Sequence, residues 1–142
     1  MKVYIASGWF NKKQEQARLE ILESCKFAKI KFYSPKDDFL YIPGKTDPEE
    51  VFNENLIQIK RSDFIIASTV DKDMGTLFEC GCSYILNKPI IYYWPGGEGP
   101  FNLMLAQTAW QVCASFEQLK FNLQNVKKDG YVKKIQYEGE IE

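Results

Sequence analysis

Short apolar runs alternate along the chain with longer segments in which apolar residues recur at helical spacing. The runs are KVYIA, KIKFYS, DFIIAS and PIIYYW, and a shorter one lies near residues 109–113. In the longer segments apolar side chains lie three or four positions apart, as Ala17, Ile21 and Cys25 do. The pattern predicts strands at 2–6, 29–34, 63–68, 89–94 and 109–113, and helices at 12–27, 48–61, 75–87, 101–106 and 115–126.

Strands that alternate with helices predict an α/β fold with a parallel, doubly wound sheet of about five strands and helices on both faces. No repeat or linker interrupts residues 1–142, so we expect a single domain, and the charged tail leaves room for a further strand at 131–137. Ligands bind such sheets at the carboxyl ends of the strands, near the switch in strand order. Those ends are the segments 7–10, 34–38, 68–73 and 94–100.

Polar residues mark where several helices begin. Asn11 and Ser115 stand directly before two of the predicted helices, where a short polar side chain accepts a hydrogen bond from a free N–H group. Thr46 or Asp47 is placed to do the same for a third helix, in which Pro48 occupies the first turn.

Composition and charge narrow the chemistry. The net charge is −1, with 18 basic and 19 acidic residues, so we expect no nucleic acid or membrane partner. No apolar run approaches the roughly 18 residues of a membrane span, and the apolar stretch at the N-terminus is too short for a signal peptide. A cytoplasmic location with reduced cysteines is therefore predicted. The chain has no histidine, which excludes Ser–His and Cys–His nucleophiles and the commonest metal ligand.

The motif DMGTLFECGCSY, residues 73–84, contains two cysteines spaced C-x-C. Residues two apart on a helix do not face each other, so Cys80 and Cys82 cannot grip one ion. Cys25 and Cys113 lie in separate elements, and zinc takes four ligands. We therefore expect no metal and no cofactor, and we expect the small residues 80–83 to pack closely on the sheet.

Glu79, in the same motif, has two interpretations from spacing alone. Thr76-Leu-Phe-Glu79 fits a capping box, in which the glutamate bonds back to the backbone N–H of the cap. Alternatively, Glu79 is an ionised carboxylate in the first turn of a helix, at the carboxyl end of a central strand. An oriented carboxylate there can act as a nucleophile.

Two interpretations are also open for each of several other polar and aromatic residues near the predicted strand ends. Asp73 is either part of a turn or a second carboxylate in the cleft of Glu79, and Asp37 is either solvated or near a ligand. Asn55, on an apolar helix face, is either a satisfied core amide or a ligand contact. Trp9 and Phe10 are either ordinary core residues or a surface on which a planar base stacks.

Four motifs together resemble one known family. DMGTLFECGCSYILNKPI resembles the D-x-G-T-x-x-E-x-G-x-A segment of the nucleoside 2-deoxyribosyltransferases. KVYIASGWF is similar to their first strand and aromatic loop, and NENLIQIKRSDFIIA to the segment before their catalytic loop. PFNLML, with the following SFEQLKF, resembles their C-terminal part, so the resemblance covers nearly the whole chain in order.

This resemblance implies a flavodoxin-like fold and transfer of a 2-deoxyribosyl group from a deoxynucleoside to a free nucleobase. Glu79 matches the nucleophile that attacks C1′, and a second base then displaces it with net retention. Asp73 matches an aspartate that holds the sugar, and Tyr4 a tyrosine that orients the nucleophile. On the base side, the matching residues are Gly8, Trp9, Phe10 and Asp37.

Four positions bear on how the implied site is completed. Asn102 and Met104 match a segment that a neighbouring subunit contributes, which implies a homo-oligomer such as a dimer or hexamer. Asn55 falls where some members carry an aspartate that handles the proton of the base, and an amide cannot donate that proton. Some members end in an aromatic residue whose terminal carboxylate closes the site, whereas this chain ends at Glu142.

Two rival functions remain open. A hydrolase of the same superfamily would cleave deoxynucleoside 5′-monophosphates and would need a cation for the phosphate. Arg18 and Arg61 are the only arginines, and we expect neither at the carboxyl end of a strand. A non-catalytic nucleotide-binding module on the same fold is the other rival.

Overall fold

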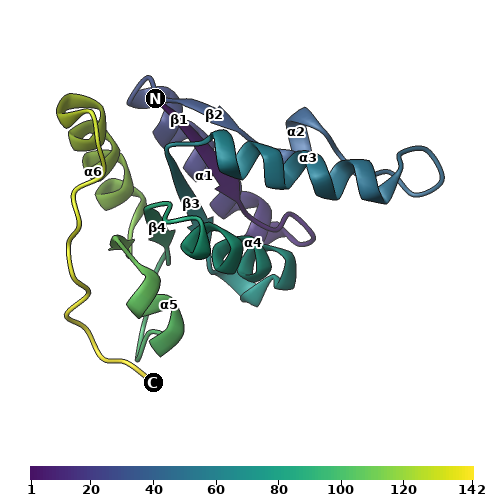
Figure 1. Cartoon of the computed structure of the whole chain (residues 1–142). Coiled ribbons are helices and arrows are strands. Elements are labelled where there is room, and N and C mark those ends of the chain that lie inside the picture. The colour runs from purple at the N-terminus through teal and green to yellow at the C-terminus, as the bar shows by residue number, and fades with distance from the viewer.

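Five parallel strands form one sheet in a computed structural model that describes all 142 residues (Figure 1). The spatial order is β2-β1-β3-β4-β5, which is the flavodoxin-like order. The strands are β1 (Lys2–Ala6), β2 (Lys31–Tyr33), β3 (Phe64–Ser68), β4 (Ile90–Tyr93) and β5 (Gln111–Cys113). The predicted α/β, doubly wound class is confirmed, and the strand order switches between β1 and β3.

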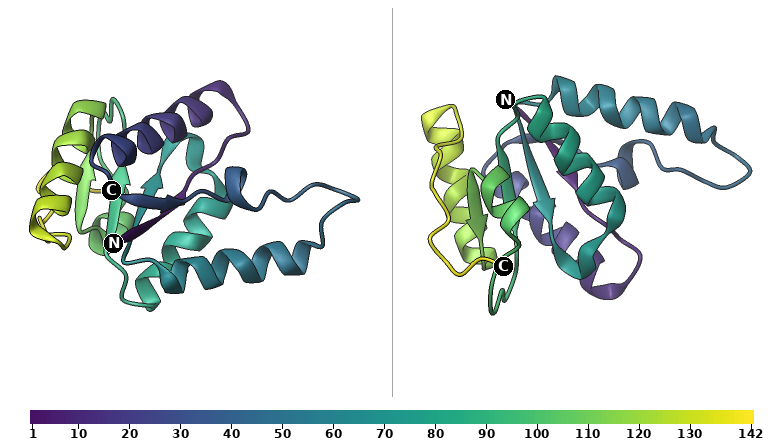
Figure 2. Two further views of the ribbon diagram at one scale, coloured as in Figure 1. Left: turned by 90° about the horizontal axis from the view of Figure 1, so that it is seen from above. Right: turned by 60° about the horizontal axis from the view of Figure 1, so that its bottom comes forward.

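Helices cover both faces of this sheet (Figure 2). One face packs against α1 (Lys12–Phe27) and α6 (Phe116–Asp129). The other packs against α3 (Pro48–Arg61), α4 (Met74–Ile85) and α5 (Leu103–Thr108). The shorter elements are α2 (Pro35–Asp38) and a 3-10 turn, Val70–Lys72. None of the helices is long and apolar enough to cross a membrane.

The alternation of side chains along β1 divides the core in two. Val3 and Ile5 belong to the cluster under α1 and α6, whereas Tyr4 and Ala6 belong to the cluster under α3 and α4. Successive side chains of a strand point to opposite faces, so this division follows from the strand geometry. As a result, the Tyr4 ring lies on the same side of the sheet as α4, which carries Glu79.

Helix caps explain most element boundaries. The Asn11, Asp47 and Ser115 side chains accept hydrogen bonds from N–H groups of the helices they precede, as predicted. The short helix near residue 101 begins later than predicted, because Asn102 caps it by accepting from the N–H of Leu105 at 3.1 Å.

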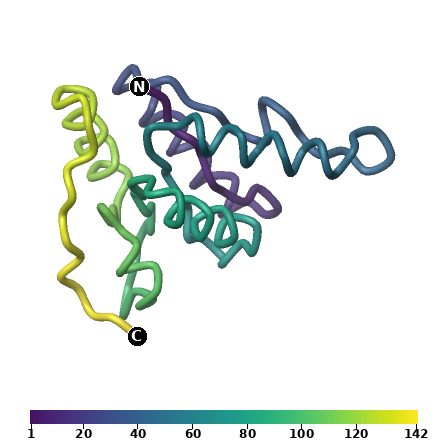
Figure 3. Tube along the Cα trace, in the orientation of Figure 1, coloured from purple at the N-terminus to yellow at the C-terminus, as the bar shows by residue number.

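The C-terminal segment after α6 does not form the strand that was expected at 131–137. It crosses beside β5 as an irregular chain (Figure 3). The N–H of Ile135 donates to the carbonyl of Trp110 at 2.8 Å, but the carbonyl of Lys133 accepts from the Gln111 side chain instead of its backbone. These two bonds tie the segment to the β5 region, but no backbone ladder forms between them.

The packing of α6 gives a test of this fold. We expect Leu119→Ala to lower the free energy of unfolding by about 2–5 kcal/mol. Leu119 is fully buried on the inner face of α6, and the loss of its side chain leaves a cavity. Phe121→Ala on the same helix is the control, since that ring is 63% exposed, and we expect a change within about 0.5 kcal/mol. Urea unfolding measures both, and equal losses would contradict the packing described.

Candidate active site

Glu79 is a partly buried residue of α4, and its side chain is hydrogen-bonded to a residue of the sheet. The Tyr4 hydroxyl on β1 donates a hydrogen bond to Oε2 of Glu79. Tyr4 is fully buried, so its ring is fixed by the core and holds the carboxylate in one place. Tyr4 is the middle residue of β1, and β1 borders the switch in strand order, which lies between β1 and β3.

The start of α4 excludes the capping-box interpretation of Glu79. Asp73 is the cap, and its Oδ2 accepts from the N–H and the hydroxyl of Thr76 at 2.9 and 2.8 Å. Glu79 therefore falls in the second turn, and its side chain bonds to Tyr4 instead of the backbone at Thr76. The expectation that Glu79 stands in the first turn was also wrong, since the helix begins at Met74.

The environment of Glu79 raises its pKa to about 7. Burial is the main cause, the negative charge of Asp73 adds to it, and the hydrogen bond from Tyr4 opposes it. Burial and the negative charge of Glu79 raise the pKa of Tyr4, so its phenol stays protonated and acts as a hydrogen-bond donor. At neutral pH the site therefore holds a carboxylate close to its titration point and a neutral donor beside it.

Gly8 brings the loop after β1 against the loop before α4. A Cβ at this position would lie 2.7 Å from Oε1 of Gln14 and 3.1 Å from Cβ of Asp73, so a side chain here would displace the Gln14 side chain and press against Asp73. Trp9 and Phe10 follow, with ring centroids 5.1 Å apart, and Phe10 is 72% exposed. The predicted residues Tyr4, Gly8, Asp73 and Glu79 thus meet, with the two rings on the loop beside them.

Tyr33, the last residue of β2, was not recognised as a site residue from the sequence. Its ring stacks on Tyr4 with centroids 5.8 Å apart and an angle of 22° between the planes. Its hydroxyl is buried and has no hydrogen-bond partner. The signal that could have revealed it is the equivalent position of Tyr4 and Tyr33 in neighbouring strands, which places both on one face.

Asn55, on α3, has a buried side-chain oxygen without a hydrogen-bond partner. The interpretation of Asn55 as a satisfied core amide is therefore wrong. An unpaired buried acceptor is costly, by about 1–3 kcal/mol, unless something else bonds to it. Its role as a ligand contact stays a prediction.

Arg18 reaches the carboxyl end of β2, contrary to expectation. Its guanidinium, only 4% exposed, donates to the Ser34 hydroxyl at 3.1 Å and to Asp37 at 2.6 Å. It also makes two hydrogen bonds to Glu15, whose pKa falls to about 2 chiefly because of them. Asp37 is thus an ion-pair partner on α2, and the positive charge of Arg18 is already matched by two carboxylates.

Asn102 and Met104 are not brought to Glu79 within one chain. They line a separate cavity of about 420 Å³ beside Leu77 of α4. Glu142 lines the same cavity, and its carbonyl accepts from the N–H of Leu103 at 2.7 Å. Met104 is 68% exposed, so its side chain is available to another molecule.

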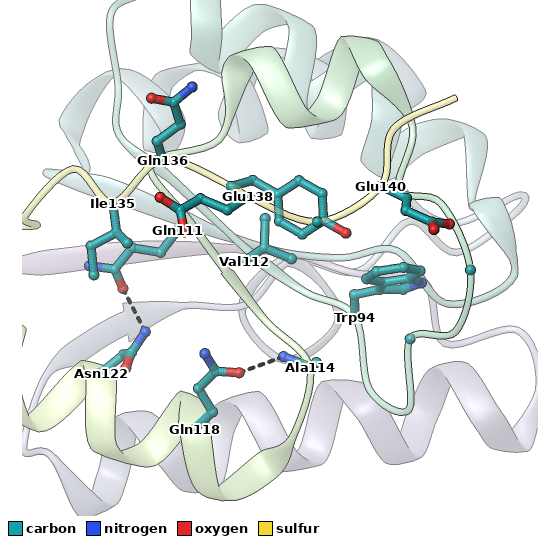
Figure 4. A pocket seen from close by; sticks show the side chains of 14 residues that line it. Trp94, Gln111, Val112, Ala114, Gln118, Asn122, Ile135, Gln136, Glu138 and Glu140 are labelled. Atoms are coloured by element: carbon teal, nitrogen blue, oxygen red, sulfur yellow. Dashed lines mark hydrogen bonds between the residues drawn. The ribbon is translucent and has the colours of Figure 1, made fainter.

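The largest cavity lies away from all the predicted site residues. It has a volume of about 610 Å³ and is enclosed by β5, α6 and the C-terminal segment (Figure 4). Three of its amides are paired with protein groups: Gln111 accepts from Asn122 at 3.1 Å, and Gln118 from the N–H of Ala114 at 2.9 Å. No carboxylate there approaches the geometry around Glu79, so the site described above remains the candidate.

The cysteines of the C-x-C pair have different environments. Cys80 is buried in the core under α3 and α4, and Cys82 is partly exposed. Gly81 faces open space, so only Cys80 and Ser83 pack inward as expected of residues 80–83. No group of three or more Cys, Asp or Glu side chains is arranged to hold a metal ion.

Several solved structures have the same fold as this chain. The 2-deoxyribosyltransferase of Bacillus psychrosaccharolyticus is 24% identical, with a TM-score of 0.77 over 95% of this chain and 99% of that one. A conserved protein of Enterococcus faecalis V583 is 17% identical, with a TM-score of 0.73 over 88% and 98%. The CMP N-glycosidase of Clostridium botulinum is also 17% identical, with a TM-score of 0.60 over 88% and 99%.

Sequence comparison assigns the family. No curated protein matches the chain. The sequence model described as Nucleoside 2-deoxyribosyltransferase matches residues 3–124, a span that includes Tyr4, Asp73, Glu79 and the N-terminal part of α6. The chain therefore belongs to the nucleoside 2-deoxyribosyltransferase family.

Proposed function

We propose that this protein transfers a 2-deoxyribosyl group between nucleobases, with Glu79 as the covalent nucleophile. The observation that carries the proposal is the bond from the buried Tyr4 hydroxyl to the Glu79 carboxylate at the switch in strand order. The chemistry needs neither metal nor histidine, because a carboxylate can attack an anomeric carbon directly. The four free cysteines fit a cytoplasmic enzyme, and nucleoside salvage is the corresponding role.

The reaction has two displacement steps. An oxygen of the Glu79 carboxylate attacks C1′ of the deoxynucleoside, the C1′–N bond breaks, and the leaving base keeps its electron pair and takes up a proton from water. A nitrogen of a second base then attacks C1′ of the glycosyl-enzyme, loses its proton and releases the carboxylate. Two inversions at C1′ give net retention.

The neighbouring groups have distinct roles in this scheme. The neutral Tyr4 hydroxyl orients Glu79 and stabilises its ionised form by donating a hydrogen bond to the carboxylate. Asp73 has one oxygen engaged as the helix cap, and no hydrogen bond occupies Oδ1, which is available to a sugar hydroxyl. The half-buried ring of Trp9 and the exposed ring of Phe10 offer an apolar surface for the base.

In this scheme Asn102 and Met104 of one subunit complete the site around Glu79 of a neighbouring subunit. They lie apart from Glu79 in their own chain, and Met104 is largely exposed. The outer face of α3 and α4 carries exposed Phe52, Phe78 and Ile85, an apolar surface that suits a second copy. A homo-oligomer with shared sites follows.

Hydrolysis of a nucleoside monophosphate is the alternative. The shared fold of the CMP N-glycosidase and the reach of Arg18 to the end of β2 favour it. Against it, Glu15 and Asp37 already neutralise Arg18, so a phosphate would have to displace a carboxylate. Free nucleosides are therefore the proposed substrates.

Glu79→Ala tests the nucleophile. We expect base exchange between a deoxynucleoside and a second free base to fall by at least about three orders of magnitude, because the covalent route is removed. Chromatography of the nucleosides measures it, and Glu117→Ala, on the exposed face of α6, is the control that keeps full activity. Exchange at the wild-type rate in Glu79→Ala would rule out the assignment and leave a non-catalytic binding module in play. If wild type releases free sugar equally with and without a second base, it is a hydrolase.

Tyr4→Phe tests the electrostatics of the site. Because the Tyr4 hydrogen bond lowers the pKa of Glu79, its loss leaves burial and Asp73 to raise that pKa above about 7. The acid limb of kcat/KM then moves to higher pH, and activity drops more at pH 6 than at pH 9. Tyr92→Phe, on the same face of the sheet but bonded to Thr108, should keep the wild-type profile. An unshifted limb in Tyr4→Phe would refute the coupling.

Mixed oligomers test the shared site. Asn102→Asp preserves the helix cap while changing the amide, and Glu79→Ala lacks the nucleophile. If each variant alone is inactive, co-expression should restore about a quarter of the wild-type activity, since half of random dimers carry one intact site. No recovery in co-purified hetero-oligomers would show that Asn102 serves its own chain or none.

A further inference from the structure

Tyr33 has a side chain that the protein buries without satisfying. It is 7% exposed, and its hydroxyl is covered yet makes no hydrogen bond. Buried hydroxyl groups are ordinarily paired, because an unpaired one loses its bonds to water without replacement. The hydroxyls of Tyr4, Tyr92 and Tyr93, which are buried on the neighbouring strands, all have partners.

The surroundings of the Tyr33 hydroxyl keep it protonated, so it can donate a hydrogen bond. Burial and the carboxylates of Glu54, Asp38 and Glu79 raise the pKa of Tyr33 to about 12, so the phenol stays protonated at any working pH. Those three groups come from α3, α2 and α4, and Lys2 lies 5.6 Å from the ring centroid. The hydroxyl is therefore a protonated donor near negatively charged groups, and it makes no hydrogen bond to any of them.

The position of Tyr33 ties it to the reacting centre. Its ring stacks on Tyr4, which holds Glu79, and it lies on the side of Tyr4 where β2 forms the sheet edge. Trp9 and Phe10 lie on the loop that follows β1, and β2, which ends at Tyr33, is paired with β1. Asn55 adds a second unpaired atom, an acceptor, on the helix that covers the same face.

We propose that the Tyr33 hydroxyl donates a hydrogen bond to an acceptor atom of the nucleobase, as a further substrate-contacting residue. This inference rests on the proposed function. The hydroxyl is covered in the free protein, so a neighbouring side chain moves when the base binds. The bond also favours departure of the base, because the ring gains electron density as the C1′–N bond breaks.

Tyr33→Phe separates this role from a structural one. We expect kcat/KM for base exchange to fall roughly 5- to 10-fold, the effect of one neutral hydrogen bond. We also expect the Tm to stay equal or rise, because no protein bond is lost. Tyr93→Phe is the matched control, since its hydroxyl donates to Glu20 at 3.0 Å on the opposite face. That control should lower the Tm and leave kcat/KM unchanged.

Base analogues identify the contacted atom. In wild type, one of the 1-, 3- and 7-deaza analogues of adenine should lose as much in kcat/KM as Tyr33→Phe does. Combined with Tyr33→Phe, that analogue should lose nothing further, because both changes remove the same bond. The thermal shift given by free adenine reports binding without turnover, and it should be smaller in Tyr33→Phe than in wild type.

Several results would overturn the proposal. Unchanged kcat/KM in Tyr33→Phe would do so, as would a loss of Tm like that of Tyr93→Phe, which would mean that the hydroxyl is already bonded in the free protein. Additive losses for all three deaza bases, with non-additivity for a 3′-deoxy substrate instead, would move the contact to the sugar. A wild-type protein that binds adenine but exchanges no bases would refute the proposed function and leave the thermal-shift comparison as the test of Tyr33.

Discussion

The hydrogen bond from Tyr4 to Glu79 is the constraint on which the rest of the site depends. It joins a fully buried ring in a central strand to a carboxylate on the helix that packs over that strand. A partly buried carboxylate ordinarily has a cation beside it, but here the stabilising group is a neutral phenol. The pKa of Glu79 therefore stays near 7, well above that of an exposed glutamate, and the carboxylate remains reactive.

The sheet topology makes this pair possible. Because β1 lies between β2 and β3, the loop after β1 can meet the loop before α4, and Gly8 allows the two to touch. Asp73 then has two tasks, since it caps α4 and sets the negative charge beside Glu79. A change in the cap would move the helix start and with it the carboxylate, so local helix geometry and site electrostatics are coupled.

Much of this was predictable from local patterns. The alternation of apolar runs and helical segments gave the strands and helices within a few residues, and the DMGTLFECGCSY motif gave Asp73 and Glu79. Besides the strand expected at 131–137 and the helix turn of Glu79, the errors concern groups that reach across elements. Arg18 extends from α1 to the end of β2, and the unpaired Tyr33 hydroxyl results from strand pairing and the packing of α3. Neither leaves a periodic trace in the sequence, because each depends on which elements become neighbours in space.

The charges around the site fit the proposed chemistry better than they fit phosphate binding. The negative charge of Asp73 acts on Glu79, and the charges of Glu54 and Asp38 act on the neighbouring Tyr33. The nearest guanidinium, Arg18, is held by Glu15 and Asp37. Cleavage of a glycosidic bond develops positive charge on the sugar, and uncompensated carboxylates stabilise that charge as it forms. The same carboxylates repel a phosphate dianion, so one electrostatic feature supports both parts of the proposal, the reaction at C1′ and a substrate without a 5′-phosphate.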